Sequence, residues 1–269
     1  MSLLSAVLLG VVQGVTEFLP VSSSAHLILA RAFFGWDAEG LGVAFDVACH
    51  VGTLAAVMVF FRADLRAMVR ALPDALSRTP APDARRIQLI AVGTIPIVIV
   101  GLLWADWLEA TTRTPLVAAT ALLLGAALLL SIERLGPHGK SEDALGAMGA
   151  FLVGVAQSAA LIPGVSRSGA TIAAGMALGL RREVAARFTF LMSIPAILAA
   201  AAKKGLELRT VPFGAQEALL FAVGMATSAI VGYVTVKYFV RFLANHRLDV
   251  FAWYRVALAA ATFVWLAGR

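Results

Sequence analysis

Residues Thr16–Leu27 read TEFLPVSSSAHL, a polar segment within a chain that is otherwise strongly apolar. A carboxylate, three consecutive serines and a histidine fall within these 12 residues, with a proline among them. Proline interrupts a helix, and polar side chains are costly inside a bilayer. The segment therefore predicts a helix break that is kept at membrane depth for a functional reason.

The composition supports a membrane setting. Of 269 residues, 60% are hydrophobic and 14% are charged, and the mean hydropathy is +0.87. A soluble domain is closer to half apolar and a quarter charged. We therefore expect an all-α, polytopic integral membrane protein. The net charge of +6 is attributed to loop arginines that orient a membrane protein and not to nucleic-acid binding.

Six segments are apolar enough to cross the hydrocarbon core, which needs about 20 residues of helix. Two further apolar stretches, Ser2–Phe34 and Ala144–Gly179, are interrupted at LPVSSS and IPGVSRSG. Each half is too short to span, so both are predicted to be re-entrant helical hairpins, with the irregular backbone surrounded by protein. The six predicted spans are Gly42–Phe61, Arg86–Ala105, Pro115–Ile132, Ala186–Ala202, Gln216–Lys237 and Val250–Gly268.

The two interruptions resemble each other. LGVVQG from Leu9 aligns with VGVAQS from Val153, 144 residues later, and VSSSA and VSRSG follow at the same spacing. One hairpin and three spans in each half predict an inverted-topology repeat of about residues 1–135 and 145–269, within a single membrane domain of residues 1–269. Such repeats place a site near the bilayer midplane, where broken helices face each other.

Lysines and arginines predict the orientation. One side of this topology carries 14 of them and the other carries 6. The positive-inside rule makes the first side cytoplasmic and places both termini outside. The cytoplasmic loops would be Arg62–Arg86, Arg134–Lys140, Arg181–Arg187 and Lys237–Arg247.

The two tips carry the candidate site residues. Gln13 and Glu17 are four apart and share a helix face, and serines at the start of the second half-helices can cap free N–H groups where an anion is also favoured. Arg167 offers a planar fork suited to phosphate oxygens. Structural roles remain open: the serines as simple caps, Arg167 as a partner that neutralises Glu17, and Asp46 with His50 as a bonded pair or a secondary polar contact.

At these residues the chain resembles a known family. QGVTEFLPVSSSAHL and LIPGVSRSGATI are similar to the two signature motifs of the bacterial undecaprenyl-pyrophosphate phosphatases associated with bacitracin resistance. The resemblance implies a plasma-membrane hydrolase with its site open to the outer face. Such an enzyme removes the terminal phosphate of a C55 isoprenyl pyrophosphate and so recycles the lipid carrier of peptidoglycan synthesis.

The family's functional residues carry over onto both motifs, and its cofactor would be Mg²⁺ or Ca²⁺. Gln13 stands where the family's pattern has a first carboxylate, so it would join Glu17 as a weaker metal ligand. The expected partners are the lipid substrate and membrane lipids, and a homodimer is compatible with the sequence. The expected catalytic residues are Glu17, Ser23, His26 and Arg167, and the expected phosphate-binding residues are Ser22, Ser24, Ser166, Arg167, Ser168 and Thr171.

The mechanism expected from these residues is in-line attack on the terminal phosphorus by Ser23 or by water, with His26 moving the proton. Arg167 and the helix N-termini would hold the pyrophosphate, as positioning and charge dominate phosphoryl transfer. The alternative is a transporter or flippase for isoprenyl lipid phosphates, because inverted repeats with broken helices are also typical of alternating-access carriers. Phosphate release by purified protein separates the two functions.

Overall fold

A computed structural model describes residues 1–36, 42–135, 139–207 and 214–268, and these residues form helices and connecting turns without a β-strand. Six of the helices are long and apolar enough to cross a membrane. The predicted all-α, polytopic membrane fold is confirmed. The six long helices are α3 (Gly42–Phe60), α5 (Pro82–Thr112), α6 (Pro115–Leu135), α9 (Arg182–Glu207), α10 (Ala215–Leu243) and α11 (Asp249–Ala267).

Two pairs of short helices occupy the interrupted segments. The first pair is α1 (Leu3–Thr16) and α2 (Ser23–Phe34), and the second is α7 (Ala147–Ala159) and α8 (Arg167–Ala177). None of these helices has the length of about 20 residues that a span requires. Both helix breaks are therefore where the sequence predicts them, while re-entry of the pairs from the two membrane surfaces stays a prediction.

The segment Arg62–Arg86 was expected to be a loop and is largely helical. It contains α4 (Arg62–Ala71), a 3₁₀ turn at Leu72–Asp74 and the first residues of α5. Pro82 is the first residue of α5, a position where proline is favoured because its missing N–H has no partner in a helix anyway. Proline in this segment therefore starts a helix, and the connecting loop is shorter than predicted. A second 3₁₀ turn lies at Glu142–Ala144.

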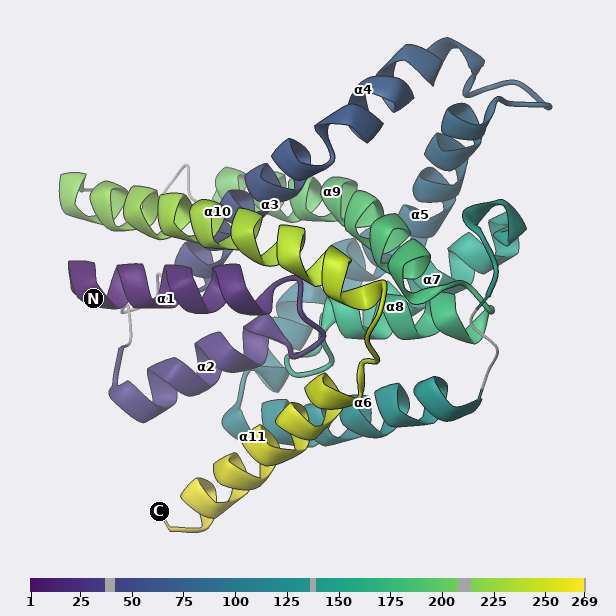
Figure 1. Cartoon of the computed structure of the whole chain (residues 1–269). Coiled ribbons are helices and arrows are strands. Elements are labelled where there is room, and N and C mark those ends of the chain that lie inside the picture. Colours follow the sequence, from purple (N-terminus) through teal and green to yellow (C-terminus); the bar gives the residue numbers. More distant parts are fainter. Residues whose placement is uncertain (37–41, 136–138, 208–213, 269) are drawn as a thin grey trace.

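The helix ends gather at two ends of the bundle, and both chain termini lie at the same end (Figure 1). We call this the termini end. At the opposite end, Glu133 contacts Arg182 at 2.5 Å and Arg247 at 3.6 Å, and Arg86 contacts Glu142 at 2.6 Å. The three arginines of these ion pairs belong to segments that the charge pattern assigned to one side. Arg209 and Arg269, counted on the other side, lie outside the described residues.

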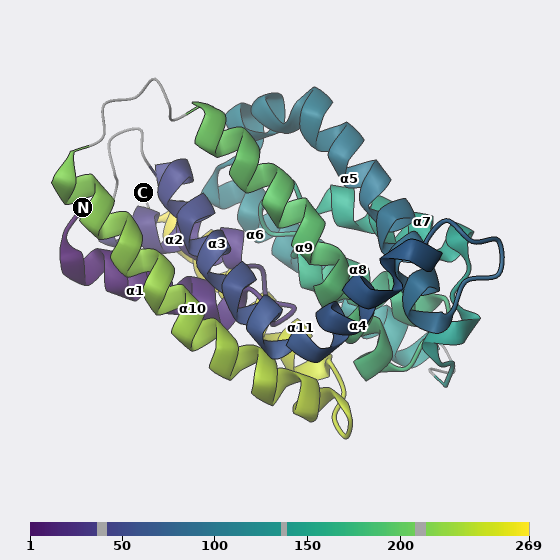
Figure 2. The ribbon, with the colours of Figure 1, turned by 90° about the horizontal axis from the view of Figure 1, so that it is seen from above.

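Close helix contacts at glycines hold the short helices α1 and α7 against two of the long helices. A Cβ on Gly14 of α1 would lie 2.7 Å from Val231 of α10, and a Cβ on Gly154 of α7 would lie 2.1 Å from the Gly93 carbonyl of α5. Only glycine permits such backbone approach. Viewed from above, α1 lies along α10, while α7 lies beside α5 on the far side of the molecule (Figure 2). The two helix breaks consequently face each other in the interior.

Candidate active site

The two helix breaks meet directly. The Ser168 hydroxyl donates a hydrogen bond to the Leu19 carbonyl at 3.0 Å, and the Arg167 guanidinium contacts the Glu17 carboxylate. These contacts join residues about 150 positions apart in the sequence. The polar groups of both motifs therefore form one site at the point where α2 and α8 begin.

The turns that precede α2 and α8 have the same geometry. Ser22 and Ser166 adopt φ of 71° and 72°, a region that residues other than glycine rarely occupy. Each caps its helix, with the Ser22 hydroxyl accepting from the Ala25 N–H at 3.4 Å and the Ser166 hydroxyl accepting from the Gly169 N–H at 3.1 Å. Strained backbone of this kind is retained mainly at functional sites, and both turns present a helix N-terminus suited to an anion.

Glu17 is the most heavily contacted group of the site, and its side chain is only 4% exposed. Its carboxylate accepts hydrogen bonds from the Gln13 amide and from the Ser23 hydroxyl, both at 2.7 Å. The His50 Nε2 lies 3.3 Å from the same carboxylate oxygen, and Arg167 contacts the other oxygen. Glu17 is therefore placed to accept a proton from Ser23 while Arg167 offsets its charge.

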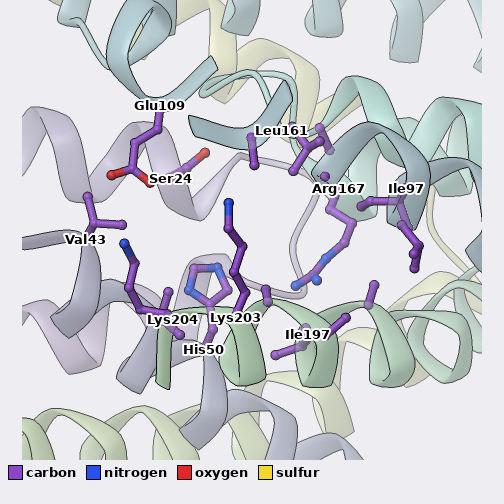
Figure 3. A pocket seen from close by; sticks show the side chains of 18 of the residues that line it. Ser24, Val43, His50, Ile97, Glu109, Leu161, Arg167, Ile197, Lys203 and Lys204 are labelled. Atoms are coloured by element: carbon purple, nitrogen blue, oxygen red, sulfur yellow. The ribbon is translucent and has the colours of Figure 1, made fainter. Parts of the chain in front are cut away.

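A cavity of about 320 Å³ opens beside this cluster. His50 and Arg167 project toward it, and Lys203 and Lys204 of α9 approach it from the same side as His50 (Figure 3). The cavity continues to Asp106, which lies near the end of α5 and is 84% exposed. It thus connects the helix tips to the termini end, with apolar walls supplied by α5 and α9. Its lining includes six predicted site residues, namely Glu17, Ser22, Ser23, Ser24, Ser166 and Arg167.

His26 lies beside the Ser22 turn, and its predicted role in moving the Ser23 proton stays a prediction. Its Nδ1 lies 2.7 Å from the Ser22 carbonyl oxygen, which can only accept, so Nδ1 carries the hydrogen. Its Nε2 lies 2.7 Å from the Tyr254 hydroxyl, and the two rings stack. Both ring nitrogens are engaged and His26 does not line the cavity. The side chain that contacts Ser23 is Glu17, and His26 supports the strained Ser22 turn.

Three more predicted site residues lie behind the cavity wall. The Thr171 hydroxyl donates to the Arg167 carbonyl of its own helix at 2.7 Å, and the side chain is fully buried. Ser168 joins the two tips, as described above. Gln13 is also fully buried; its amide nitrogen donates to Glu17, and its Oε1 has no hydrogen-bond partner among the described residues. Ser168 and Thr171 are therefore placed to support the turn.

Two residues of α11 contact the site although neither belongs to the two sequence motifs. Tyr254 contacts His26, and Arg255 donates to backbone carbonyls of both tips. An arginine in an otherwise apolar span was the available sequence signal. By contrast, Asp46 is bound by Arg31 and Arg113, both at 2.6 Å, which makes it a structural centre near the termini end.

The donors near Glu17 fit a divalent cation only in part. The described residues contain no cluster of three or more His, Cys, Asp or Glu side chains around a common point. They do place one carboxylate beside the unpaired, buried Gln13 Oε1. Mg²⁺ commonly binds through one or two carboxylates together with substrate phosphates. The set therefore suits a cation shared with a phosphorylated substrate better than one held by the protein alone.

Comparison with known proteins agrees with this architecture. Residues 6–261 match the family described as "Bacitracin resistance protein BacA". An undecaprenyl-diphosphatase of Rubrobacter xylanophilus is 48% identical, and the alignment covers 97% of each chain. One of Alcanivorax borkumensis is 45% identical, with 97% of this chain and 98% of the relative covered. Because the match extends over nearly the whole chain, this protein belongs to the BacA bacitracin resistance family.

Proposed function

We propose that this protein hydrolyses undecaprenyl diphosphate to undecaprenyl phosphate and inorganic phosphate. The observation that carries the proposal is the hydrogen bond of 2.7 Å from the Ser23 hydroxyl to the Glu17 carboxylate. It lies at the junction of two helix N-termini, in a cavity with apolar walls. A nucleophile, a base and an anion-binding turn in one place are the parts that phosphoryl transfer requires.

The reaction begins with an exchange of partners at Arg167. In the free protein this guanidinium contacts Glu17, and in the complex it turns to the terminal phosphate, where its planar fork binds two oxygens. Glu17 is then free to take the Ser23 proton. The Ser23 oxygen bonds to the terminal phosphorus as the bridging P–O bond breaks, and undecaprenyl phosphate leaves. Water then attacks the phosphoserine and the Ser23–phosphorus bond breaks; the Ser23 oxygen takes its proton back from Glu17, and both protons of the water leave with inorganic phosphate or pass to solvent.

The remaining residues of the tips bind and orient. Ser22, Ser24 and Ser166 line the cavity and offer hydroxyl groups to the phosphates, while Ser168, Thr171 and His26 hold the two turns in shape. Glu17 and Gln13 would hold Mg²⁺ or Ca²⁺ together with the substrate, and the cation would add to the neutralisation of phosphate charge. The isoprenyl chain leaves the cavity along its apolar wall, where Val98, Leu102 and Ile197 are available.

The setting of the reaction is the bacterial plasma membrane, with the active site facing outward. The support is twofold: the cavity runs from the tips to the termini end, and the excess of lysine and arginine lies at the opposite end. Hydrolysis on the outer face would return the lipid carrier to peptidoglycan synthesis and lower the amount of pyrophosphate lipid available to bacitracin.

The decisive experiment measures phosphate release from undecaprenyl diphosphate by the purified protein in non-ionic detergent, with Mg²⁺, with Ca²⁺ and with EDTA. Ser23→Ala should lose nearly all activity, and rapid quenching of the parent should trap phosphate on Ser23. Turnover without a trapped phosphoserine, together with substantial activity in Ser23→Ala, would assign the attack to water. No phosphate release under any condition would refute the proposal and leave a carrier of lipid phosphates as the remaining function.

A further inference from the structure

Arg255 is a fully buried arginine in the middle of α11, a helix that packs along α6 (Figure 1). Its guanidinium donates only to backbone carbonyls among its described hydrogen bonds, and these belong to both helix breaks and to α6. The acceptors are the carbonyl oxygens of Pro20, Ala121, Leu122, Gly164 and Val165, at 2.9 to 3.4 Å. A single side chain thus joins the turn before α2, the turn before α8 and a neighbouring span.

The space for this guanidinium is provided by glycine. A Cβ on Gly125 of α6 would lie 1.8 Å from the Arg255 Nη2, so any larger residue would displace the fork. Gly164 adopts φ of +99°, which turns its carbonyl within 2.9 Å of the same nitrogen. Two glycines on separate elements therefore make room for the Arg255 guanidinium. A side chain with only a packing role would not need such a site.

The positive charge of Arg255 is buried without a carboxylate partner among the described residues. None of the ion pairs formed by the described residues includes Arg255, although it is fully buried. Burying an unpaired charge is costly. At the tips, Glu17 and Arg167 are in contact and offset each other. The charge that remains uncompensated beside the two turns is that of Arg255.

The position of this charge is close to the cavity surface. Val165, which accepts from Arg255, directly precedes Ser166, and Pro20 lies two residues before Ser22; both serines line the cavity. The guanidinium therefore lies immediately behind the turns that present helix N-termini to the cavity. An anion entering the cavity would interact with it through a medium of low dielectric, where electrostatic attraction is strong.

We propose that Arg255 is a positioning residue of the phosphate site: it holds both turns in register and supplies the net positive charge that attracts the pyrophosphate group. The assignment builds on the proposed function, since it names the group that sets anion affinity at the same site. It does not require Arg255 to touch the substrate. Charge and register are separable, because lysine keeps the first but cannot reach five carbonyls in two turns and a helix.

The test is binding of inorganic pyrophosphate to the purified full-length protein in EDTA, measured by isothermal titration calorimetry, alongside phosphate release from undecaprenyl diphosphate. Arg255→Gln should weaken pyrophosphate binding by about tenfold or more, equivalent to about 1.4 kcal/mol. Arg255→Lys should bind within about threefold of the parent yet lose at least about tenfold in kcat, because misaligned groups slow the chemical step. Arg187→Gln, which removes an exposed positive charge paired with Asp64 at the opposite end, is the matched control.

Pyrophosphate affinity in Arg255→Gln within about threefold of the parent would overturn the proposal. So would equal weakening in the lysine and glutamine variants, since charge would then not set the affinity. If Arg255→Gln does not fold, Gly125→Ala tests the register with the charge still present: pyrophosphate affinity should stay within about threefold of the parent while kcat falls by at least about tenfold, and a parent-like kcat would refute the proposal. A parent that binds pyrophosphate through Arg255 but releases no phosphate would refute the proposed hydrolysis alone.

Discussion

Replacing Glu17 by glutamine should have opposite effects on catalysis and on anion binding. The substitution keeps the shape of the side chain but removes the acceptor of the Ser23 proton and the partner of Arg167. Loss of a positioned general base costs about 10²- to 10⁴-fold in rate. Arg167, however, no longer has to leave a carboxylate before it binds phosphate, so inorganic pyrophosphate should bind more tightly in the absence of a divalent cation.

The size of the gain follows from the contact between Glu17 and Arg167. Opposite unit charges about 4 Å apart interact by about 4 kcal/mol at an effective dielectric constant of about 20. The gain in binding free energy is smaller than this interaction, because the freed guanidinium is poorly solvated in the buried site. Gln13, Ser23 and His50 also contact Glu17, so its charge is already partly offset. We therefore expect pyrophosphate affinity to rise by about tenfold, or about 1.4 kcal/mol.

Isothermal titration calorimetry with sodium pyrophosphate in EDTA, paired with a phosphate-release assay, measures both effects. Glu109→Gln is the matched control, because Glu109 also lines the cavity but lies toward the termini end of α5. This control should change pyrophosphate affinity by less than about threefold. Unchanged or weaker pyrophosphate binding in Glu17→Gln would show that Arg167 does not exchange Glu17 for phosphate, and activity close to that of the parent would remove Glu17 from the role of base.

Other outcomes follow from the same contacts. Arg167→Lys keeps the charge but loses the bidentate fork, so kcat/KM should fall by at least about 10²-fold without loss of folding; near-parent turnover would make Arg167 a simple point charge. Gln13→Glu adds a second carboxylate beside Glu17 and should lower the Mg²⁺ concentration needed for half-maximal activity, whereas an unchanged titration would remove this helix face from the metal site. With Cys49 replaced, a cysteine at Gly268 should react with an impermeant maleimide in intact cells and one at Ser77 should not; the reverse pattern would invert the topology.

Local signals in the sequence were sufficient for the spans and the breaks. An apolar run long enough to cross a bilayer indicates a transmembrane helix. Proline and glycine beside serines indicate a helix break. The exceptions were at element ends. The helix α4 lies in a segment that was expected to be a cytoplasmic loop, and Pro82, which was expected to mark that loop, is the first residue of a helix.

The polar groups of the site were also readable from sequence, because they have few reasons to occur in an apolar chain. Glu17, Ser23 and Arg167 were expected to meet, and the structure brings them together. The hydrogen-bond partner of each side chain could not be predicted from the sequence. His26 is three residues from Ser23 and was expected to move its proton, yet it bonds to Ser22 and Tyr254, while Glu17, six residues away, accepts from Ser23. Helix direction and the turn at Ser22 decide which side chain faces which.

The sequence by itself thus determined the all-α membrane fold, the two helix breaks and the set of polar residues at them, since each depends on composition and spacing over a few turns. Tertiary structure alone decided the contacts between distant segments. Gly14 and Gly154 allow the short helices to approach their neighbours closely, and the packing of distant segments places Glu17 against Arg167. Arg255 shows the limit most clearly, because its role depends on carbonyl groups, which every residue carries, and only packing can select which of them surround one guanidinium.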